Sequence, residues 1–567
     1  MVRPTEEQQT AVEKFGTGRP LKITAFAGAG KTSTLMLLAD ARQSRGLYLA
    51  FNKATAEEAA GKFPKTVDCR TTHSIAFRHI MPAFQSAPKL SSTLHPRQLA
   101  EIAGFESRTF GEHIHLTSVQ QAHLVLGTLR RFCQSADPTL ADVHVPRYGR
   151  LLGANAATLA EVRSAAVAEA AKLWKRMIAK GDDVPMGHDG YLKLWALRKP
   201  KLPADYILLD EAQDTNPVVL AVLQAQASQI VYVGDRHQQI YEWRGAVNAM
   251  EQVKGCEEAS LTQAFRFGEK IASAASQVIA TLGEKQRLRG NPAVRSMVKS
   301  PGPPTRAVLS RTNASVIIEV LDATRAGQRP HIVGGTAELT RLLTDVYELK
   351  KAKPASSPEF FGFVNWSEVV EFADSEEGES IRTFTQLVEQ HGESTLWAAV
   401  KGISSDERGA GVVLSTAHKA KGREWDSVRL SGDFVSSAQG SVRAQSEADV
   451  RLLYVAITRA RELLCIDPDM LAHFTTGAWK APKEAPPARR ISSAPLAEGA
   501  PARGHAAPRS AQRYVDPAQR AAAPNPSQRV RSAASPPKSP AAPSAATKTK
   551  KKAEKKDVAS WKRLFGR

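Results

Sequence analysis

One short segment, residues 25–32, limits the possible folds of this chain more than any other feature. It reads Ala-Phe-Ala-Gly-Ala-Gly-Lys-Thr and directly follows the apolar stretch Leu21–Thr24, which is typical of a buried strand. Gly28 and Gly30 allow the backbone to turn tightly, so that successive N–H groups can point at one anion. An apolar helical stretch comes next, and the N-terminus of a helix also favours negative charge. The segment therefore predicts a phosphate-binding loop between a strand and a helix.

The end of this loop indicates the ligand. Lys31 can reach the outer phosphates of a nucleoside triphosphate, and Thr32 offers a hydroxyl oxygen to Mg²⁺. The first position of the usual pattern is Ala25 here instead of glycine, which the loop tolerates if that residue has ordinary dihedral angles. We therefore expect a nucleoside triphosphate and Mg²⁺ as ligands.

The positive charge of the chain is concentrated near its C-terminal end. The 567 residues carry a net charge of +20, and residues 481–567 alone hold 19 Lys/Arg against 5 Asp/Glu. Residues 477–567 are rich in Pro, Ala and Ser and cannot bury enough apolar surface to fold alone, so they are predicted to be a disordered basic tail. Such a tail should add salt-sensitive affinity for nucleic acid. Near its end, Trp561, Leu564 and Phe565 share one face at helical spacing, which predicts either a docking peptide or a few apolar residues in a flexible tail.

Cysteine usage and hydropathy favour a protein outside the membrane in a reducing compartment. The four cysteines are far apart with no CxxC pair, which argues against a zinc or iron–sulfur site. No signal peptide and no apolar run long enough for a membrane span are apparent. We expect a cytoplasmic protein, associated with the nucleoid of a bacterium or encoded by a phage. Nuclear residence is the alternative in a eukaryote, because Lys548–Lys556 is similar to an import signal.

Short apolar runs between helical stretches predict an α/β fold with parallel sheets covered on both faces. Seven runs stand out: Leu21–Thr24, Gly46–Phe51, Tyr206–Leu209, Ile230–Val233, Ala307–Ser310, Gly411–Ser415 and Ser427–Leu430. Residues 80–200 contain amphipathic stretches such as Val119–Phe132 and Ala156–Lys180, which predict a helical insertion. Residues 335–405 predict a second, shorter insertion of helix and loop.

One of these strands ends in two adjacent carboxylates. Tyr206–Leu209 is followed by Asp210-Glu211-Ala-Gln-Asp214. In nucleotide-hydrolysing sheets such a strand end lies beside the phosphate loop, where Asp210 would hold Mg²⁺ through water and Glu211 would act as general base. An acidic pair alone is usually a solvated surface feature. Its position after an apolar strand and downstream of a phosphate loop favours the catalytic interpretation.

The next strand leads into a polar loop with aromatic residues. Ile230–Val233 is followed by Gly-Asp-Arg-His-Gln238, and Gln238 is placed to sense the γ-phosphate. Tyr241, Trp243 and Arg244 come directly afterwards. Aromatic rings beside cations suit stacking on unpaired bases, which contributes about 1–3 kcal/mol per base. Taken alone, a tryptophan is more often a core residue.

Together these segments resemble the motifs of superfamily 1 helicases of the UvrD/Rep/PcrA type, and most closely those of the F-box DNA helicase branch, here without an apparent F-box. Asp210–Asp214 is similar to the second motif of that family, and residues 234–246 are similar to the third. Further similar segments follow the family order: Glu7–Val12, Leu49–Lys53, Thr71–Ser74, Leu261–Phe267, Thr416–Trp425 and Tyr454–Ala460. The resemblance covers roughly residues 1–470.

The resemblance implies a role for each matching residue. The catalytic set would be Lys31, Asp210, Glu211, Gln238, Arg266 and Arg459, with the two arginines as arginine fingers. ATP would be bound by Gln8, Ala27, Gly28, Ala29, Gly30, Lys31, Thr32, Ser33, Phe265 and Glu424, and Mg²⁺ by Thr32 and Asp210. Gln8 and Phe265 would contact adenine, and Glu424 would contact the ribose. The DNA strand would be contacted by Phe51, Asn52, Lys53, Thr72, His73, Tyr241, Trp243, Arg244 and His418.

The resemblance also implies a domain organisation with two RecA-like lobes of the P-loop NTPase fold. The expected boundaries are 1–79 and 201–255 for the first lobe, 80–200 for the helical insertion, 256–334 and 406–476 for the second lobe, 335–405 for the short insertion, and 477–567 for the tail.

The expected function is an ATP-dependent DNA helicase that moves along single-stranded DNA and acts at duplex junctions in repair, recombination or replication. A 3′→5′ direction is implied by the resemblance alone. A replication or repair protein is the expected partner of Trp561–Phe565. One alternative is a DNA-stimulated translocase that strips proteins from DNA. The other is a non-enzymatic nucleic-acid-binding scaffold, against which the intact catalytic set argues.

Overall fold

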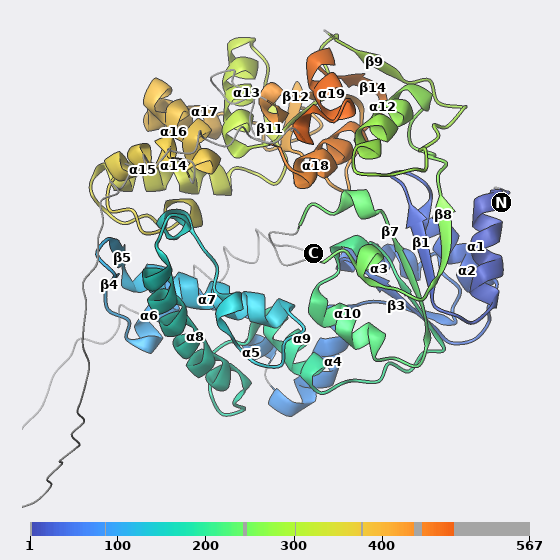
Figure 1. The fold of residues 1–567 in the computed structure, drawn as a ribbon, viewed down its shortest axis with the longest axis horizontal. Coiled ribbons are helices and arrows are strands. Elements are labelled where there is room, and N and C mark those ends of the chain that lie inside the picture. Colours follow the sequence, from blue (N-terminus) through green and yellow to red (C-terminus); the bar gives the residue numbers. More distant parts are fainter. Residues whose placement is uncertain are drawn as a thin grey trace, which may run out of the picture. The chain divides into compact units, whose positions relative to one another are not determined.

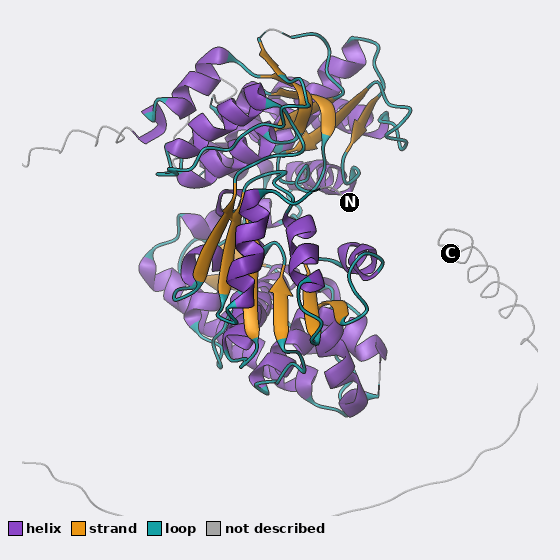
Figure 2. Ribbon diagram, turned by 90° about the vertical axis from the view of Figure 1, so that its right-hand side faces the viewer, coloured by secondary structure: helices purple, strands orange, loops and turns teal. Residues whose placement is uncertain are grey.

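The described part of the chain is built on two six-stranded parallel sheets and one small antiparallel hairpin (Figures 1 and 2). The computed structural model describes residues 3–85, 87–241, 247–300, 302–375, 378–435 and 445–480. Residues 481–567, which include the Trp561–Phe565 segment, and the predicted DNA contacts Trp243 and Arg244 lie outside these residues. The first residues of the predicted tail are folded instead: Ala478–Lys480 form a short 3₁₀ helix, and Trp479 donates a 3.1 Å hydrogen bond to the Thr281 hydroxyl because its ring packs against the core of the second lobe. The predicted fold class, two parallel-sheet lobes with helical insertions, is confirmed.

The first sheet carries the phosphate loop. Its strand order is β3 (Val67–Thr71), β2 (Gly46–Ala50), β6 (Tyr206–Leu209), β7 (Gln229–Gly234), β1 (Leu21–Ala25) and β8 (Glu257–Leu261). Every residue of β2, β6 and β7 is buried, as expected for a parallel sheet with helices on both faces. The helices of this lobe are α1 (Glu6–Gly16), α2 (Lys31–Asp40), α3 (Lys53–Ala60), α4 (Thr72–Phe84), α10 (Pro217–Gln224) and α11 (Ala249–Gln252).

The second sheet has the order β11 (Pro330–Ile332), β12 (Val412–Thr416), β10 (Ala307–Ser310), β13 (Trp425–Leu430), β14 (Ala460–Cys465) and β9 (Met297–Lys299). Its helices are α12 (Glu269–Ala280), α13 (Asn313–Arg325), α18 (Glu447–Ile457) and α19 (Pro468–Thr475). Apolar residues of α12, α18, β10 and β13 share one core.

The structure corrects the expected boundary at residue 256. Strand β8 pairs with β1, from Leu21 opposite Glu257 to Ala25 opposite Leu261, and therefore belongs to the first sheet. The physical reason is that β8 is an edge strand with alternating exposure, so it lacks the continuous apolar run that marks central strands. The chain passes to the second lobe after Leu261.

The first insertion is mainly helical. It contains α5 (Ala87–Ser91), α6 (Pro96–Ala103), α7 (Ser118–Gln134), α8 (Ala156–Ile178) and α9 (Gly187–Leu197). The hairpin of β4 (Arg108–Phe110) and β5 (Ile114–Leu116) was not expected from the sequence. Asn155 begins α8 by accepting a hydrogen bond from the Thr158 N–H, which agrees with the predicted start of this helix.

The second insertion packs against the first. It contains α14 (Ala337–Lys350), α15 (Trp366–Asp374), α16 (Glu379–His391) and α17 (Glu393–Lys401). Phe361 joins an apolar cluster of the first insertion, and Arg150 pairs with Glu368 at 2.7 Å. No helix within the described ranges is long and apolar enough to cross a membrane.

Candidate active site

The phosphate loop has the conformation that its glycines predict. It connects β1 to α2, and Gly28 and Gly30 have φ angles of +72° and +75°, in the left-handed region. A Cβ atom on Gly28 would lie 2.8 Å from the Cβ of Arg266. Glycine is therefore required at this position both by the backbone and by the close approach of a catalytic candidate.

Two carboxylates and a lysine meet beside this loop. Lys31 Nζ lies 3.3 Å from Glu211 Oε1. Asp210 is 6% exposed and accepts a 2.8 Å hydrogen bond from the Tyr48 hydroxyl and another from the backbone N–H of Glu211. Glu211 has a φ of +51°, which is uncommon for a residue with a side chain and marks backbone strain of the kind found at active sites.

The charges of this cluster depend on one another. Burial raises the pKa of Asp210, and the Glu211 carboxylate raises it further, against the effect of the Tyr48 hydrogen bond. Burial would also raise the pKa of Glu211, but the positive charges of Lys31 and Lys421 outweigh it, so that pKa is lowered. Burial would lower the pKa of Lys31, but the surrounding carboxylates outweigh it and raise the pKa. At neutral pH Glu211 is therefore ionised and Lys31 is protonated, as a general base and a phosphate ligand require.

Asp235 organises the loop after β7. It is fully buried, and its carboxylate accepts hydrogen bonds from the Gln238 side chain at 2.8 Å and the His237 N–H at 3.0 Å. The Asp235 N–H donates to Gln213 Oε1, and the Gln213 amide in turn donates to Glu211. The predicted γ-phosphate sensor Gln238 is thus connected to the predicted base.

Two residues of the second lobe reach into this network. The Tyr454 hydroxyl, on α18, donates to Asp235 Oδ2 at 2.9 Å and accepts from the Ala27 N–H at 3.0 Å. Lys421 Nζ forms an ion pair with Asp214 and donates to the Gln238 carbonyl at 2.6 Å. Burial raises the pKa of Asp214 to about 6, although Lys421 acts in the opposite direction.

The two candidate arginine fingers approach from the same side. Arg266 forms an ion pair with Glu424 and donates to the Thr458 carbonyl at 3.2 Å. Arg459 is 1% exposed and is held by the Val455 carbonyl at 2.8 Å and by the Thr458 hydroxyl at 2.9 Å. Burial and the nearby charge of Arg266 lower the pKa of Arg459 to about 9, so its guanidinium stays charged at neutral pH. Both arginines interact electrostatically with the groups around the phosphate loop.

The predicted adenine-side residues also lie together. The Gln8 amide donates to the Thr34 hydroxyl at 3.1 Å. A Cβ on Gly30 would be 3.2 Å from the Phe265 ring and 3.6 Å from Gln8 Nε2, so both side chains border the start of α2. Phe265 is 44% exposed, and its N–H donates to the Gly28 carbonyl at 2.8 Å. An exposed ring fixed by its backbone to the phosphate loop is suited to stacking on a base.

The oxygen donors of this site fit a hard divalent cation. Mg²⁺ is bound by one or two protein oxygens together with waters and substrate phosphates. Thr32 and Asp210 offer a hydroxyl and a carboxylate of this kind near the phosphate loop. Because both Asp210 oxygens already accept hydrogen bonds, contact through water suits this carboxylate better than direct ligation. A nearby cation would also favour the charged form of Asp210.

The predicted strand-contacting residues follow neighbouring strands of the first sheet. Phe51 comes directly after β2 and is 58% exposed. Asn52 accepts a 2.9 Å hydrogen bond from the Thr55 N–H at the start of α3, and Lys53 pairs with Glu57 on the surface. Of these residues only Phe51 offers an exposed apolar ring for base stacking.

The other described candidates for DNA contact lie at the start of α4 and in the segments that contain Tyr241 and His418. Thr72 begins α4 after β3, and the neighbouring His73 lies 3.5 Å from Asp189 of the first insertion. The Tyr241 hydroxyl donates to the His418 carbonyl at 3.2 Å. The carboxyl ends of parallel strands meet at one edge of a sheet, and ligands of open α/β sheets bind there.

Several residues that complete the site had no role predicted for them. Tyr48, Asp214, Asp235, Lys421 and Tyr454 each make a buried contact in the network. All but Tyr48 lie inside the segments that resemble the family motifs, so a role for these residues could have been inferred from their position there. Only the folded chain, however, brings Tyr454 to Asp235, 219 positions away.

Comparisons with known proteins agree with this geometry. Residues 154–254 match the model of the UvrD/REP helicase N-terminal domain, and residues 349–467 match that of the UvrD-like helicase C-terminal domain. The chain is 31% identical over 512 residues to F-box DNA helicase 1 of Gallus gallus, covering 83% of this chain and 49% of that protein. It is also 31% identical over 510 residues to F-box DNA helicase protein 1 of Schizosaccharomyces pombe, covering 82% and 57% of the two chains.

A bacterial relative is more distant. ATP-dependent DNA helicase UvrD2 of Mycobacterium bovis is 26% identical over 330 residues, which is 46% of each chain. The chain thus spans about half the length of the curated relatives it matches.

Proposed function

The chain belongs to the UvrD-like helicase family, and from this premise we propose that it is an ATP-dependent DNA helicase that moves along single-stranded DNA. One observation carries the proposal: groups from both lobes meet at the phosphate loop. The Tyr454 hydroxyl of the second lobe contacts both Ala27 and Asp235 of the first lobe. A nucleotide site made by two lobes can couple ATP turnover to their relative movement. We propose 3′→5′ travel from the family resemblance alone.

The chemistry follows from the residues around the loop. Lys31 and the N–H groups of the loop bind the phosphates. Thr32 and Asp210 would hold Mg²⁺, which would supply additional positive charge. Glu211 accepts a proton from the attacking water, for which its lowered pKa keeps it ionised. Arg266 and Arg459 stabilise the negative charge that develops on the transferred phosphoryl group.

Movement along DNA follows from the position of the strand contacts. Phe51, Thr72 and His73 belong to the first lobe and His418 to the second, so one strand held by both would be gripped differently as the lobes open and close. Asp214 and Lys421 connect the acidic strand end of one lobe to the segment of the other lobe that contains His418. We propose that the protein acts in the compartment that contains the DNA, which is the cytoplasm of a bacterium or the nucleus of a eukaryote.

A forked duplex with a 3′ single-stranded arm tests the proposal. We expect strand release that requires ATP and is lost in Lys31→Ala but kept in the surface control Lys62→Ala. The same duplex with a 5′ arm should be released more slowly if travel is 3′→5′. Strand release by Lys31→Ala equal to that of the unaltered protein would contradict the proposed role of ATP.

A further inference from the structure

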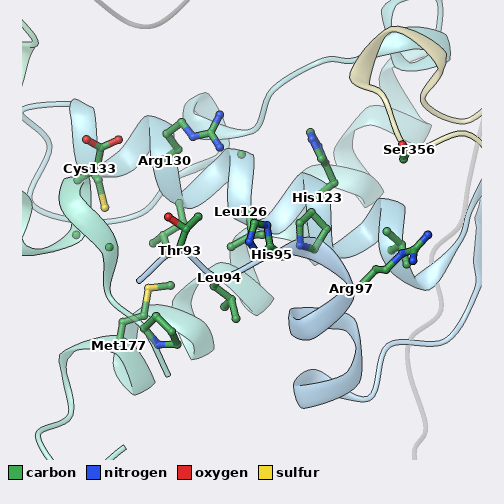
Figure 3. A pocket seen from close by; sticks show the side chains of 18 of the residues that line it. Thr93, Leu94, His95, Arg97, His123, Leu126, Arg130, Cys133, Met177 and Ser356 are labelled. Carbon is green, nitrogen blue, oxygen red and sulfur yellow. The ribbon is translucent and has the colours of Figure 1, made fainter. Parts of the chain in front are cut away.

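A second cavity, of about 730 Å³, lies apart from the nucleotide site and is lined by both insertions. Its lining residues come from the start of α6, from α7, from the start of α9, and from α14 and the segment after it. Figure 3 shows Arg97, His123 and Arg130 of the first insertion around this cavity, together with Ser356 of the second. The volume lies within the range of small-molecule sites.

Three arginines from three different helices line this cavity: Arg97, Arg130 and Arg341. Within the described ranges, none of the three side chains forms a hydrogen bond or an ion pair. Burial, together with the smaller effects of the charges of Arg130 and Arg341, lowers the pKa of His123, which lines the same cavity, to about 4. The positive charges of the two insertions therefore converge on one space.

The acidic groups near this cavity leave an excess of positive charge. Asp189 lines the cavity, but its carboxylate already interacts with His73 at 3.5 Å and Gln134 at 3.1 Å. Glu338 and Glu359 lie close enough to Arg341 to interact with its charge, although burial still raises the pKa of Glu359, and neither residue lines the cavity. An anion is the ligand that this balance favours.

The cavity is also bordered by a buried side-chain donor and by a helix N-terminus. Gln120 lines the cavity and is 4% exposed. Its Oε1 accepts from the Thr117 N–H at 3.0 Å, but its Nε2 has no hydrogen-bond partner among the described residues. Such a buried donor is costly unless a ligand or water satisfies it. Helix α9 begins at the cavity with Gly187 and has no side-chain cap, so the N–H groups of its first turn are also suited to an anion.

Part of the remaining wall is apolar, and Thr93, His95 and Ser356 add polar side chains to it. Leu94, Leu126, Leu129, Met177 and Phe361 contribute carbon atoms to the cavity. An inorganic anion would leave this surface without a partner, whereas a ligand with both a phosphate and a ring would use both parts of the wall. A nucleotide has this combination.

We propose that this cavity is a second nucleotide site, which binds the phosphate through Arg130 and Arg341 and the ring through the apolar wall. The nucleotide comes either free from solution or as one unit of a DNA strand. Because Arg130 belongs to the first insertion and Arg341 to the second, a bound nucleotide ties the two insertions together. The inference does not depend on the proposed helicase activity, since no residue of the ATP site lines this cavity.

Equilibrium dialysis with radiolabelled ADP tests the free source. The full-length protein should bind two ADP molecules per chain, and the double variant Arg130→Gln/Arg341→Gln should bind one. Arg198→Gln is the matched control, because Arg198 is an exposed arginine at the opposite end of α9, and it should still bind two. Circular dichroism and unchanged DNA-independent ATP turnover verify that the double variant is folded.

Fluorescence anisotropy with a labelled thymidine oligonucleotide tests the strand source. If the site takes a unit of DNA, the unaltered protein binds one ADP, and the double variant binds the oligonucleotide about tenfold more weakly than Arg198→Gln, as the loss of charged hydrogen bonds predicts. One ADP per chain combined with equal oligonucleotide affinities in the two variants would overturn the proposal. A second ADP site that persists in the double variant would overturn it as well.

Discussion

The two lobes contribute groups of opposite charge to the proposed nucleotide site. The first lobe contributes Asp210, Glu211, Asp214 and Asp235, which lie around Lys31. The opposite side is mainly basic and consists of Lys421, Arg459 and, on the connection between the lobes, Arg266. Neither lobe alone therefore offers both a base for water and enough positive charge for the phosphates. Substitutions on each side, and at the contact between the two sides, test this division.

Arg459→Ala should have the largest effect. Loss of an arginine finger should lower kcat for ATP hydrolysis by about 10³–10⁵-fold. Since Arg459 is buried, Arg459→Lys keeps a charge at the site and should retain more activity if the variants fold equally well. The exposed Arg325 of the same lobe provides the control Arg325→Ala. An unchanged kcat in folded Arg459→Ala would show that the basic side takes no part in ATP hydrolysis.

Glu211→Gln tests the acidic side. Removal of a general base should lower kcat by about 10²–10⁴-fold while ATP binding, measured by filter retention, persists. Glu258→Gln, at an exposed position of the edge strand β8, should leave kcat unchanged. Loss of ATP binding with unaltered turnover of the remaining complex would assign Glu211 to binding instead.

Tyr454→Phe tests the contact between the two sides. It deletes the hydrogen bonds to Asp235 and Ala27 and keeps the ring, so we expect kcat to fall about tenfold, since hydrogen bonds to charged groups contribute about 1.5–3 kcal/mol. Tyr347→Phe, an exposed tyrosine of α14, is the matched control. Equal kcat values for the two variants would show that the hydroxyl bridge is not used in turnover.

Tyr48→Phe should have the smallest effect and should appear as a shift in pH dependence. The Tyr48 hydrogen bond stabilises the charged form of Asp210 and so lowers its pKa. Its removal raises that pKa, and the acid limb of kcat/KM should move to higher pH by about one unit. Tyr206→Phe is a close control, because Tyr206 is buried in the neighbouring strand β6 and its hydroxyl has no partner among the described residues. A shift to lower pH would contradict the assigned role of the hydrogen bond.

The sequence was informative where one segment holds the whole signal. The central strands β6, β7 and β10 were predicted because they contain continuous apolar runs, and a parallel sheet buries such runs on both faces. Strand β1 alternates in burial and was predicted from its place directly before the phosphate loop. The edge strand β8 was assigned to the wrong lobe, because its exposed glutamates hide the apolar pattern.

The residues of the candidate site also differ in how far a local segment defines them. Lys31 and Glu211 could be predicted, because a loop or a strand end defines each of them locally. The partners Tyr48 of Asp210 and Tyr454 of Asp235 could not, since each contact joins segments more than 150 residues apart and exists only after the sheets and lobes have formed. The cavity between the insertions also left no local signal, since its three arginines lie on three helices.

A double-mutant cycle in single-turnover ATP hydrolysis with single-stranded DNA tests whether the acidic and basic sides act on one transition state. The rate constant is measured for the unaltered protein, Glu211→Gln, Arg459→Ala and the double variant. If the two sides act on the same transition state, the double variant should be about as slow as the slower single variant, as for groups that work as one unit. Losses that simply multiply would contradict a shared site, because they would mean that the acidic and basic sides act independently.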